Sequence, residues 1–119
     1  MRPGDGGRRL VEYRDAAIVA LAEGAGLTSG QISRVRVEDI DWPARAVRVG
    51  RGRREEVVEV EEVTMRHLVA WRNVSRIDSG PLFRPLLKGS RGHGPPLDRG
   101  LSVSRVYQIT ATATSRRAS

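Results

Sequence analysis

The stretch GAGLTSGQISRVRVEDIDW, from Gly24 to Trp42, has the most specific order of residues in this chain. The two glycines at its start are expected to end a preceding helix, because glycine readily adopts the left-handed conformation at a helix C-terminus. Thr28 followed three residues later by Gln31 is a capping-box pattern, in which each side chain bonds the backbone N–H of the other residue. This pattern predicts a short helix at about residues 29–35.

The segments on either side predict a helix before this stretch and a β-hairpin after it. Residues 10–23 carry apolar side chains at helical spacing among strong helix formers, which favours a largely buried helix. The acidic closure EDID breaks the helical pattern, and Ile40 and Trp42 are expected to anchor a turn into a strand. Two β-branched runs, 46–49 and 56–60, then flank the tip GRGRRE. They predict a hairpin with an arginine-rich tip.

The C-terminal half predicts two more helices joined by a long irregular segment. Residues 61–74 have the pattern of an amphipathic helix, and residues 81–83 that of a short buried segment. The region 84–100 is rich in glycine and proline and is expected to be a loop or an irregular hairpin. Ser102 can cap a last helix at 103 to about 111. We therefore expect an α+β fold, mainly helical, around a small antiparallel hairpin or sheet.

Charge narrows the class of ligand. The chain carries 21 lysines and arginines against 14 acidic residues, a net charge of +7, so its surface attracts polyanions, with nucleic acid as the first candidate. Lys88 is the only lysine, so the base composition of a GC-rich genome also explains the arginine content. Aromatic residues make up only 4% of the chain, which argues against a base-stacking platform.

Composition also limits the compartment and the cofactors. The chain has no cysteine, which excludes disulfides and thiolate metal sites and agrees with a reducing cytoplasm. No apolar run approaches the roughly 18 residues that a membrane span needs, so we expect no membrane partner. No ligand spacing indicates a metal ion, and we expect no cofactor.

In this order the elements resemble the first two thirds of the catalytic domain of the tyrosine recombinases, the phage integrase family. GAGLTSGQISRVRVEDID is similar to the family pattern G-T-G-L-R-x-S-E-L-x-x-L-x-x-x-D-I-D, and VGRGRREEVVEV to the hairpin written G-K-G-x-K-x-R followed by a valine run. The resemblance covers about residues 14–109. It implies strand transfer on DNA without a metal: a tyrosine attacks the scissile phosphate, two arginines and a histidine stabilise its charge, and a hairpin lysine protonates the leaving 5′ oxygen.

The sequence departs from this pattern where the chemistry should lie. The first family arginine aligns with Thr28, which offers no bidentate fork to a phosphate. The hairpin lysine aligns with Arg51, whose guanidinium stays protonated and is a poor proton donor. The H-x-x-R motif and the nucleophilic tyrosine are expected beyond Ile109, where the chain ends first, and Tyr107 is not expected to substitute. Truncation explains the missing third, whereas degeneration explains that loss and Thr28 together.

The hairpin tip supplies the first candidate DNA contacts. Arg51, Arg53 and Arg54 follow one another closely at the expected turn, and a hairpin tip can enter a groove or grip a phosphate backbone. The alternative is a solvated turn that is partly neutralised by Glu55 and Glu56.

Two further pairs of residues are candidates. Arg34 and Arg36 follow the capped helix, and each can face either DNA or the acidic residues that come next. Ser102 and Arg105 can present a helix N-terminus to a phosphate, although a plain serine cap also explains Ser102.

The sequence thus predicts a flexible lead-in at 1–9, a partial integrase-like catalytic domain at 10–111 and a frayed tail at 112–119. We expect a DNA-binding domain related to site-specific recombination and integration, without strand-transfer activity in this chain. The alternatives are a protein-interaction module that associates with itself or with an intact recombinase, and a fragment of an active integrase. Double-stranded DNA is the expected partner, at the nucleoid in the cytoplasm.

Overall fold

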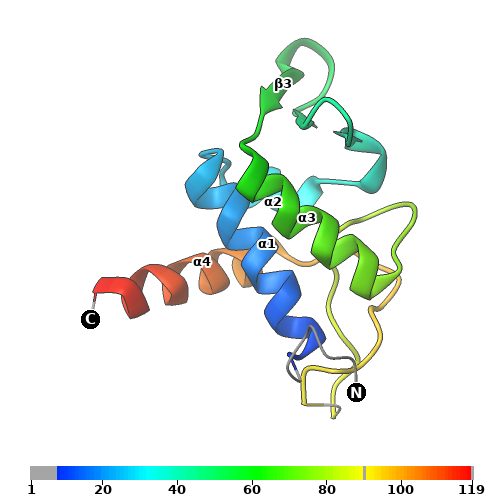
Figure 1. The fold of residues 1–119 in the computed structure, drawn as a ribbon, viewed down its shortest axis with the longest axis vertical. Helices are drawn as coiled ribbons and strands as arrows, with labels where there is room; N and C mark the ends of the chain where they lie inside the picture. Colours follow the sequence, from blue (N-terminus) through cyan, green and yellow to red (C-terminus); the bar gives the residue numbers. More distant parts are fainter. Residues whose placement is uncertain (1–7, 90, 119) are drawn as a thin grey trace.

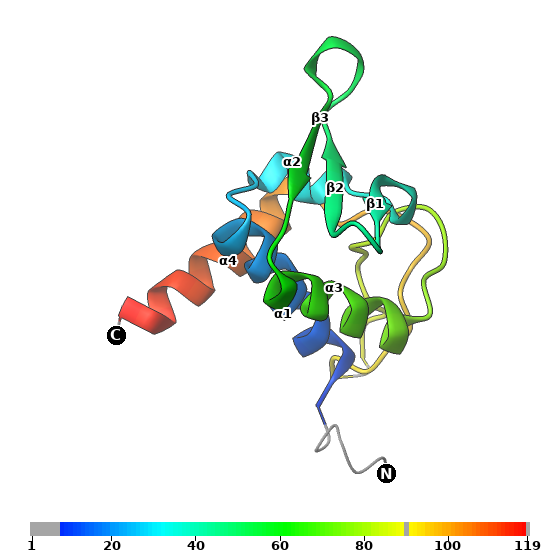
Figure 2. The ribbon, with the colours of Figure 1, turned by 45° about the horizontal axis from the view of Figure 1, so that its top comes forward.

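The computed structural model describes residues 8–89 and 91–118, so most of the expected lead-in at 1–9 lies outside the described residues. Four helices and a small sheet make up the fold (Figures 1 and 2). The elements are α1 (Leu10–Gly24), α2 (Ser29–Arg34), β1 (Ile40–Asp41), β2 (Ala46–Val49), β3 (Glu56–Glu59), α3 (Glu62–Ser75) and α4 (Val103–Ala118), with 3-10 turns at Val37–Asp39 and Gly52–Arg54. This order confirms the predicted mainly helical α+β class.

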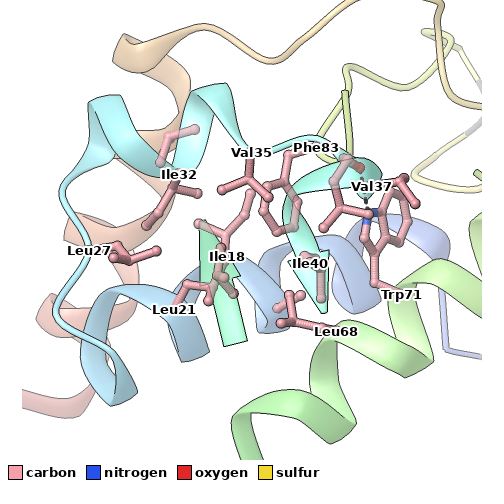
Figure 3. Packing of buried hydrophobic residues seen from close by; sticks show 14 of the residues in the cluster. Ile18, Leu21, Leu27, Ile32, Val35, Val37, Ile40, Leu68, Trp71 and Phe83 are labelled. Atoms are coloured by element: carbon pink, nitrogen blue, oxygen red, sulfur yellow. Dashed lines mark hydrogen bonds between the residues drawn. The ribbon is translucent and has the colours of Figure 1, made fainter. Parts of the chain in front are cut away.

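Helix α1 is the centre of the core, and α2, α3 and α4 pack around it. Ile18 and Leu21 of α1 have no exposed surface, and Figure 3 shows them among Leu27, Val35 and Leu68 from the neighbouring segments. Full burial of a side chain of this size contributes roughly 1.5–3 kcal/mol. The predicted buried helix is therefore confirmed.

A short extended segment, residues 81–83, holds α2 and α3 to the start of α4. Leu82 and Phe83 are fully buried. The Leu82 N–H donates to the Val35 carbonyl at 3.0 Å, and the Leu101 N–H donates to the Phe83 carbonyl at 2.8 Å. The Trp71 indole N–H of α3 donates to the Leu82 carbonyl at 2.8 Å (Figure 3). Side chains and backbone thus both anchor the segment, as predicted for a buried stretch.

The three strands form one antiparallel sheet in the order β1-β2-β3, with Val47 paired to both Ile40 and Val58. The predicted hairpin is confirmed. Gly50 opens its tip with a φ of 78°, and a β-carbon there would collide with the Arg54 carbonyl oxygen. The turn therefore requires glycine at this position.

Helix α4 ends at Ala118, seven residues beyond the predicted end near Ala111. Val106 and Ile109 anchor its first half in the core. Beyond them the helix continues as a mostly exposed arm that extends away from the other helices (Figure 1). Once a helix has started, each further residue adds a hydrogen bond, and alanines in this segment favour that extension. The early end was predicted because the segment has nothing to bury.

We expect Trp71→Phe to lower the free energy of unfolding by about 1–3 kcal/mol, because the fully buried Leu82 carbonyl loses its donor. Urea denaturation followed by circular dichroism measures this loss. Trp42→Phe is the matched control. Trp42 is half-buried, its ring lies 4.7 Å from the Arg72 guanidinium carbon, and no indole hydrogen bond joins it to another described residue. Equal losses from the two substitutions would contradict the role of the Trp71 bond.

Candidate nucleic-acid interface

The start of α2 is a complete capping box. The Thr28 hydroxyl oxygen accepts from the Gln31 N–H at 3.1 Å, and the Gln31 side-chain oxygen accepts from the Thr28 N–H at 3.0 Å. The capping pattern is therefore confirmed. The hydroxyl, the N–H and the carbonyl of Thr28 are all used to start the helix, at the position where the resemblance expects an arginine.

The hairpin tip presents three arginines to solvent. Arg51, Arg53 and Arg54 are all exposed around the 3-10 turn. Among the described residues, no hydrogen bond or ion pair engages their side chains, and Glu55 and Glu56 form no ion pair with them. The three guanidinium groups are thus not neutralised by contact, which leaves them available to an external anion.

A small hollow of about 60 Å³ lies between α2 and the base of this tip. Arg34 of α2, Arg48 of β2 and Arg51 line it together with Gln31, and Asp39 is the acidic lining residue. The structure therefore brings two predicted site residues, Arg34 and Arg51, to one place. Arg48 was missed, although the strand alternation Val47-Arg48-Val49 already placed it on the exposed face.

Arg36 is exposed and lies beside an acidic side chain. Its Nε lies 3.5 Å from Glu38 Oε1, which is the second of the two orientations that the sequence left open. The Gly80 N–H donates to Glu38 at 3.0 Å, and this bond is the main cause that holds the pKa of Glu38 below its usual value, with a smaller contribution from the charge of Arg36. Arg36 thus forms an ion pair with Glu38, and Glu38 in turn is bonded to Gly80, directly before the buried 81–83 segment.

Ser102 caps α4, because its hydroxyl oxygen accepts from the Arg105 N–H at 3.1 Å. The Arg105 side chain reaches Gln108 at 3.3 Å, and both Ser102 and Arg105 are exposed. The Ser33 hydroxyl of α2 donates to the Leu101 carbonyl at 2.7 Å. This bond places the start of α4 beside α2, but outside the hollow at the hairpin.

Within residues 8–89 and 91–118, no group of three or more histidine, aspartate and glutamate side chains is arranged to hold a metal ion. None of the described helices is long and apolar enough to cross a membrane.

We expect Thr28→Ala to lower the free energy of unfolding by about 1 kcal/mol, since the N-cap oxygen of α2 is lost. Chemical denaturation measures the change. Thr28→Ser keeps the hydroxyl and should retain most of the stability. If Thr28→Ala leaves the denaturation midpoint unchanged, the capping bond does not stabilise α2.

Comparisons with known proteins agree with this geometry. No family model matches the chain. An integrase/recombinase of Sinorhizobium fredii (strain NBRC 101917 / NGR234), y4rF, is 35% identical over 77 residues, which cover 61% of this chain and 18% of that protein. Two solved structures share the fold. The XerA recombinase has a TM-score of 0.68 at 18% identity and 96% coverage of this chain, and the integrase of mycobacterium phage Brujita has a TM-score of 0.57 at the same identity and coverage.

The chain spans 41% and 40% of the lengths of these two structures, and so corresponds to only part of each. The protein that is similar in sequence is an integrase/recombinase, and the two structures that share the fold are a recombinase and a phage integrase. The described residues therefore have a fold shared with part of a recombinase and part of a phage integrase.

Proposed function

We propose that this chain binds duplex DNA in a site-specific recombination or integration system, that the arginines of the hairpin tip contact the phosphate backbone, and that the chain does not itself transfer strands. The observation that carries the proposal is the exposed set Arg51, Arg53 and Arg54, which no described residue neutralises. The similarity to an integrase/recombinase supports the same ligand class.

The shape of the tip suits it to a phosphate backbone. The sheet projects from the helices, with the tip at its far end (Figure 2). The Arg54 N–H donates to the Arg51 carbonyl at 3.1 Å, and the Glu55 N–H donates to the Gly52 carbonyl at 3.2 Å. Because these bonds fix the turn before binding, little backbone entropy is lost when it meets DNA.

The neighbouring hollow extends the basic surface. Arg34 and Arg48 lie beside Arg51, so the tip and the exposed end of α2 can follow one strand of a duplex. Each phosphate that the protein neutralises releases condensed counterions, which makes binding strongly dependent on salt.

The same region argues against strand transfer by this chain. Thr28 is a helix cap, so no arginine stands where the family stabilises the phosphate charge. Arg51 replaces the hairpin lysine, and a guanidinium holds its proton too tightly to act as a general acid. We therefore expect DNA binding without the covalent step.

The triple substitution R51A/R53A/R54A tests the interface. We expect weaker binding to a duplex of about 30 base pairs, and a plot of log K against log salt that is flatter by up to about 2.7, since each phosphate contact contributes about 0.9. Fluorescence anisotropy at several salt concentrations measures both quantities.

The matched control is R45A/R66A/R116A, which removes three exposed charges away from the tip. It should change the slope far less. If the tip variant keeps the affinity and the slope of the unmodified chain, the hairpin does not contact DNA. If the unmodified chain fails to bind duplex DNA at low salt, the proposed function is wrong.

A nicked duplex that traps phosphotyrosyl intermediates tests the catalytic part. We expect no covalent protein–DNA adduct on a denaturing gel at any protein concentration that saturates binding. An active recombinase of this family serves as the positive control. An adduct that disappears in Tyr107→Phe would show that this exposed tyrosine is a nucleophile and would overturn the expectation.

A second candidate function is association with another copy of the chain or with an intact recombinase. The observation that favours it is a groove of about 580 Å³ between α1 and α4, whose lining includes Val19, Ala20 and Ile109. Sedimentation velocity separates the two candidates: a monomer that binds DNA supports the first, and a dimer that does not bind DNA supports the second.

A further inference from the structure

The described part of the loop at residues 84–100, which carries a second set of cations, lies at the opposite end of the molecule from the hairpin tip (Figure 1). The loop between α3 and α4, the start of α4 and the start of α1 enclose a hollow of about 520 Å³. Its charged lining residues are all cationic: Arg14, Lys88, Arg91, Arg99 and Arg105.

Neighbouring hollows have mixed charge. The groove between α1 and α4 is lined by the acidic residues Asp15 and Glu23 as well as by arginines. In the hollow at the turn of residues 76–80, three acidic residues balance three arginines. The absence of acid from the lining of the loop hollow therefore does not simply follow from the high arginine content of the chain.

Three of the five cations lack a partner among the described residues. Lys88, Arg91 and Arg99 are exposed, and no hydrogen bond or ion pair in residues 8–89 and 91–118 engages their side chains. Arg14 differs, because it is 3% exposed and its Nε lies 2.9 Å from Asp15 Oδ1. Arg14 thus stays a structural residue at the base of the hollow.

Hydrogen bonds join the described part of this loop to α1 and to itself. The Val11 N–H of α1 donates to the Gly92 carbonyl at 3.0 Å, and Arg9 donates to the Arg91 carbonyl at 3.2 Å. The Leu87 N–H donates to the Pro95 carbonyl at 3.0 Å. These bonds restrict the loop backbone before binding. Little backbone entropy is therefore lost when the cations contact a ligand.

We propose that Lys88, Arg91 and Arg99 form a second phosphate-binding surface, which contacts the DNA backbone independently of the hairpin tip. This inference rests on the proposed DNA binding. Positive side chains that face a common hollow without neutralising acid repel one another, and the phosphates of a nucleic acid remove that repulsion. The longest dimension of the molecule is 44 Å, which corresponds to roughly 13 base pairs at 3.4 Å per pair.

The test compares five proteins on a duplex of about 30 base pairs by fluorescence anisotropy across a salt series: the unmodified chain, K88A/R91A/R99A, R51A/R53A/R54A, the control R45A/R66A/R116A and a charge-retaining loop variant. We expect the loop variant to bind more weakly and to flatten the salt dependence by up to about 2.7. The charge-retaining variant K88R/R91K/R99K should keep the slope of the unmodified chain, and thermal denaturation shows that each variant is folded.

Other outcomes would overturn either the second surface alone or both proposals. If the loop variant matches the unmodified chain or the control while the hairpin variant loses affinity, the second surface is wrong and the proposed function stands. If the charge-retaining variant loses the slope as well, the loop does not act through its charge, and the second surface is wrong. If the unmodified chain does not bind duplex DNA at low salt, both are wrong.

Discussion

The hydrogen bond from the Trp71 indole to the Leu82 carbonyl is the contact on which the arrangement of the other elements depends. Trp71 is the largest fully buried side chain, and Leu82 and Phe83 are buried with it. A carbonyl in such surroundings must be paired, since an unpaired one costs about 1–3 kcal/mol. The bond therefore holds this irregular segment against α3.

Through this segment the core controls the position of the basic surfaces. The backbone of residues 80–83 bonds Val35 and Val37 on one side and Leu101 on the other. The first contact sets the end of α2 and hence Arg34 at the base of the hairpin. The second sets the first turn of α4 and the loop that precedes it. Both candidate surfaces are thus sets of exposed cationic side chains held by one buried segment.

Local patterns were sufficient to predict most elements. The Thr28–Gln31 cap, the glycine-initiated hairpin tip and the apolar face of α1 are decided by residues within a few positions of one another, so the sequence alone reveals them. The end of α4 was missed because helix propagation needs no burial once the first turns are anchored.

The candidate sites depend on contacts that are distant in sequence, and they were predicted less completely. Glu38, which lies 3.5 Å from Arg36, also accepts from the Gly80 N–H, which is 42 residues away along the chain. The loop hollow combines Arg14 with cations more than 70 positions later. No periodicity or motif connects such residues, because tertiary packing alone brings them together.

The described residues share their fold with recombinase structures, and the local contacts give a physical reason why this fold does not depend on an arginine at position 28. The fold needs α2 to start at residue 29 and needs Gly50 to turn the hairpin. The Thr28 side chain meets the first requirement because its oxygen accepts a backbone N–H of α2, whereas an arginine side chain has only donors. Phosphate contact needs only exposed cations on fixed backbone, which Arg51 and its neighbours supply. The Thr28 cap therefore maintains the start of α2 without an arginine at this position, and under the proposed function the exposed cations of the tip are sufficient to attract a polyanion.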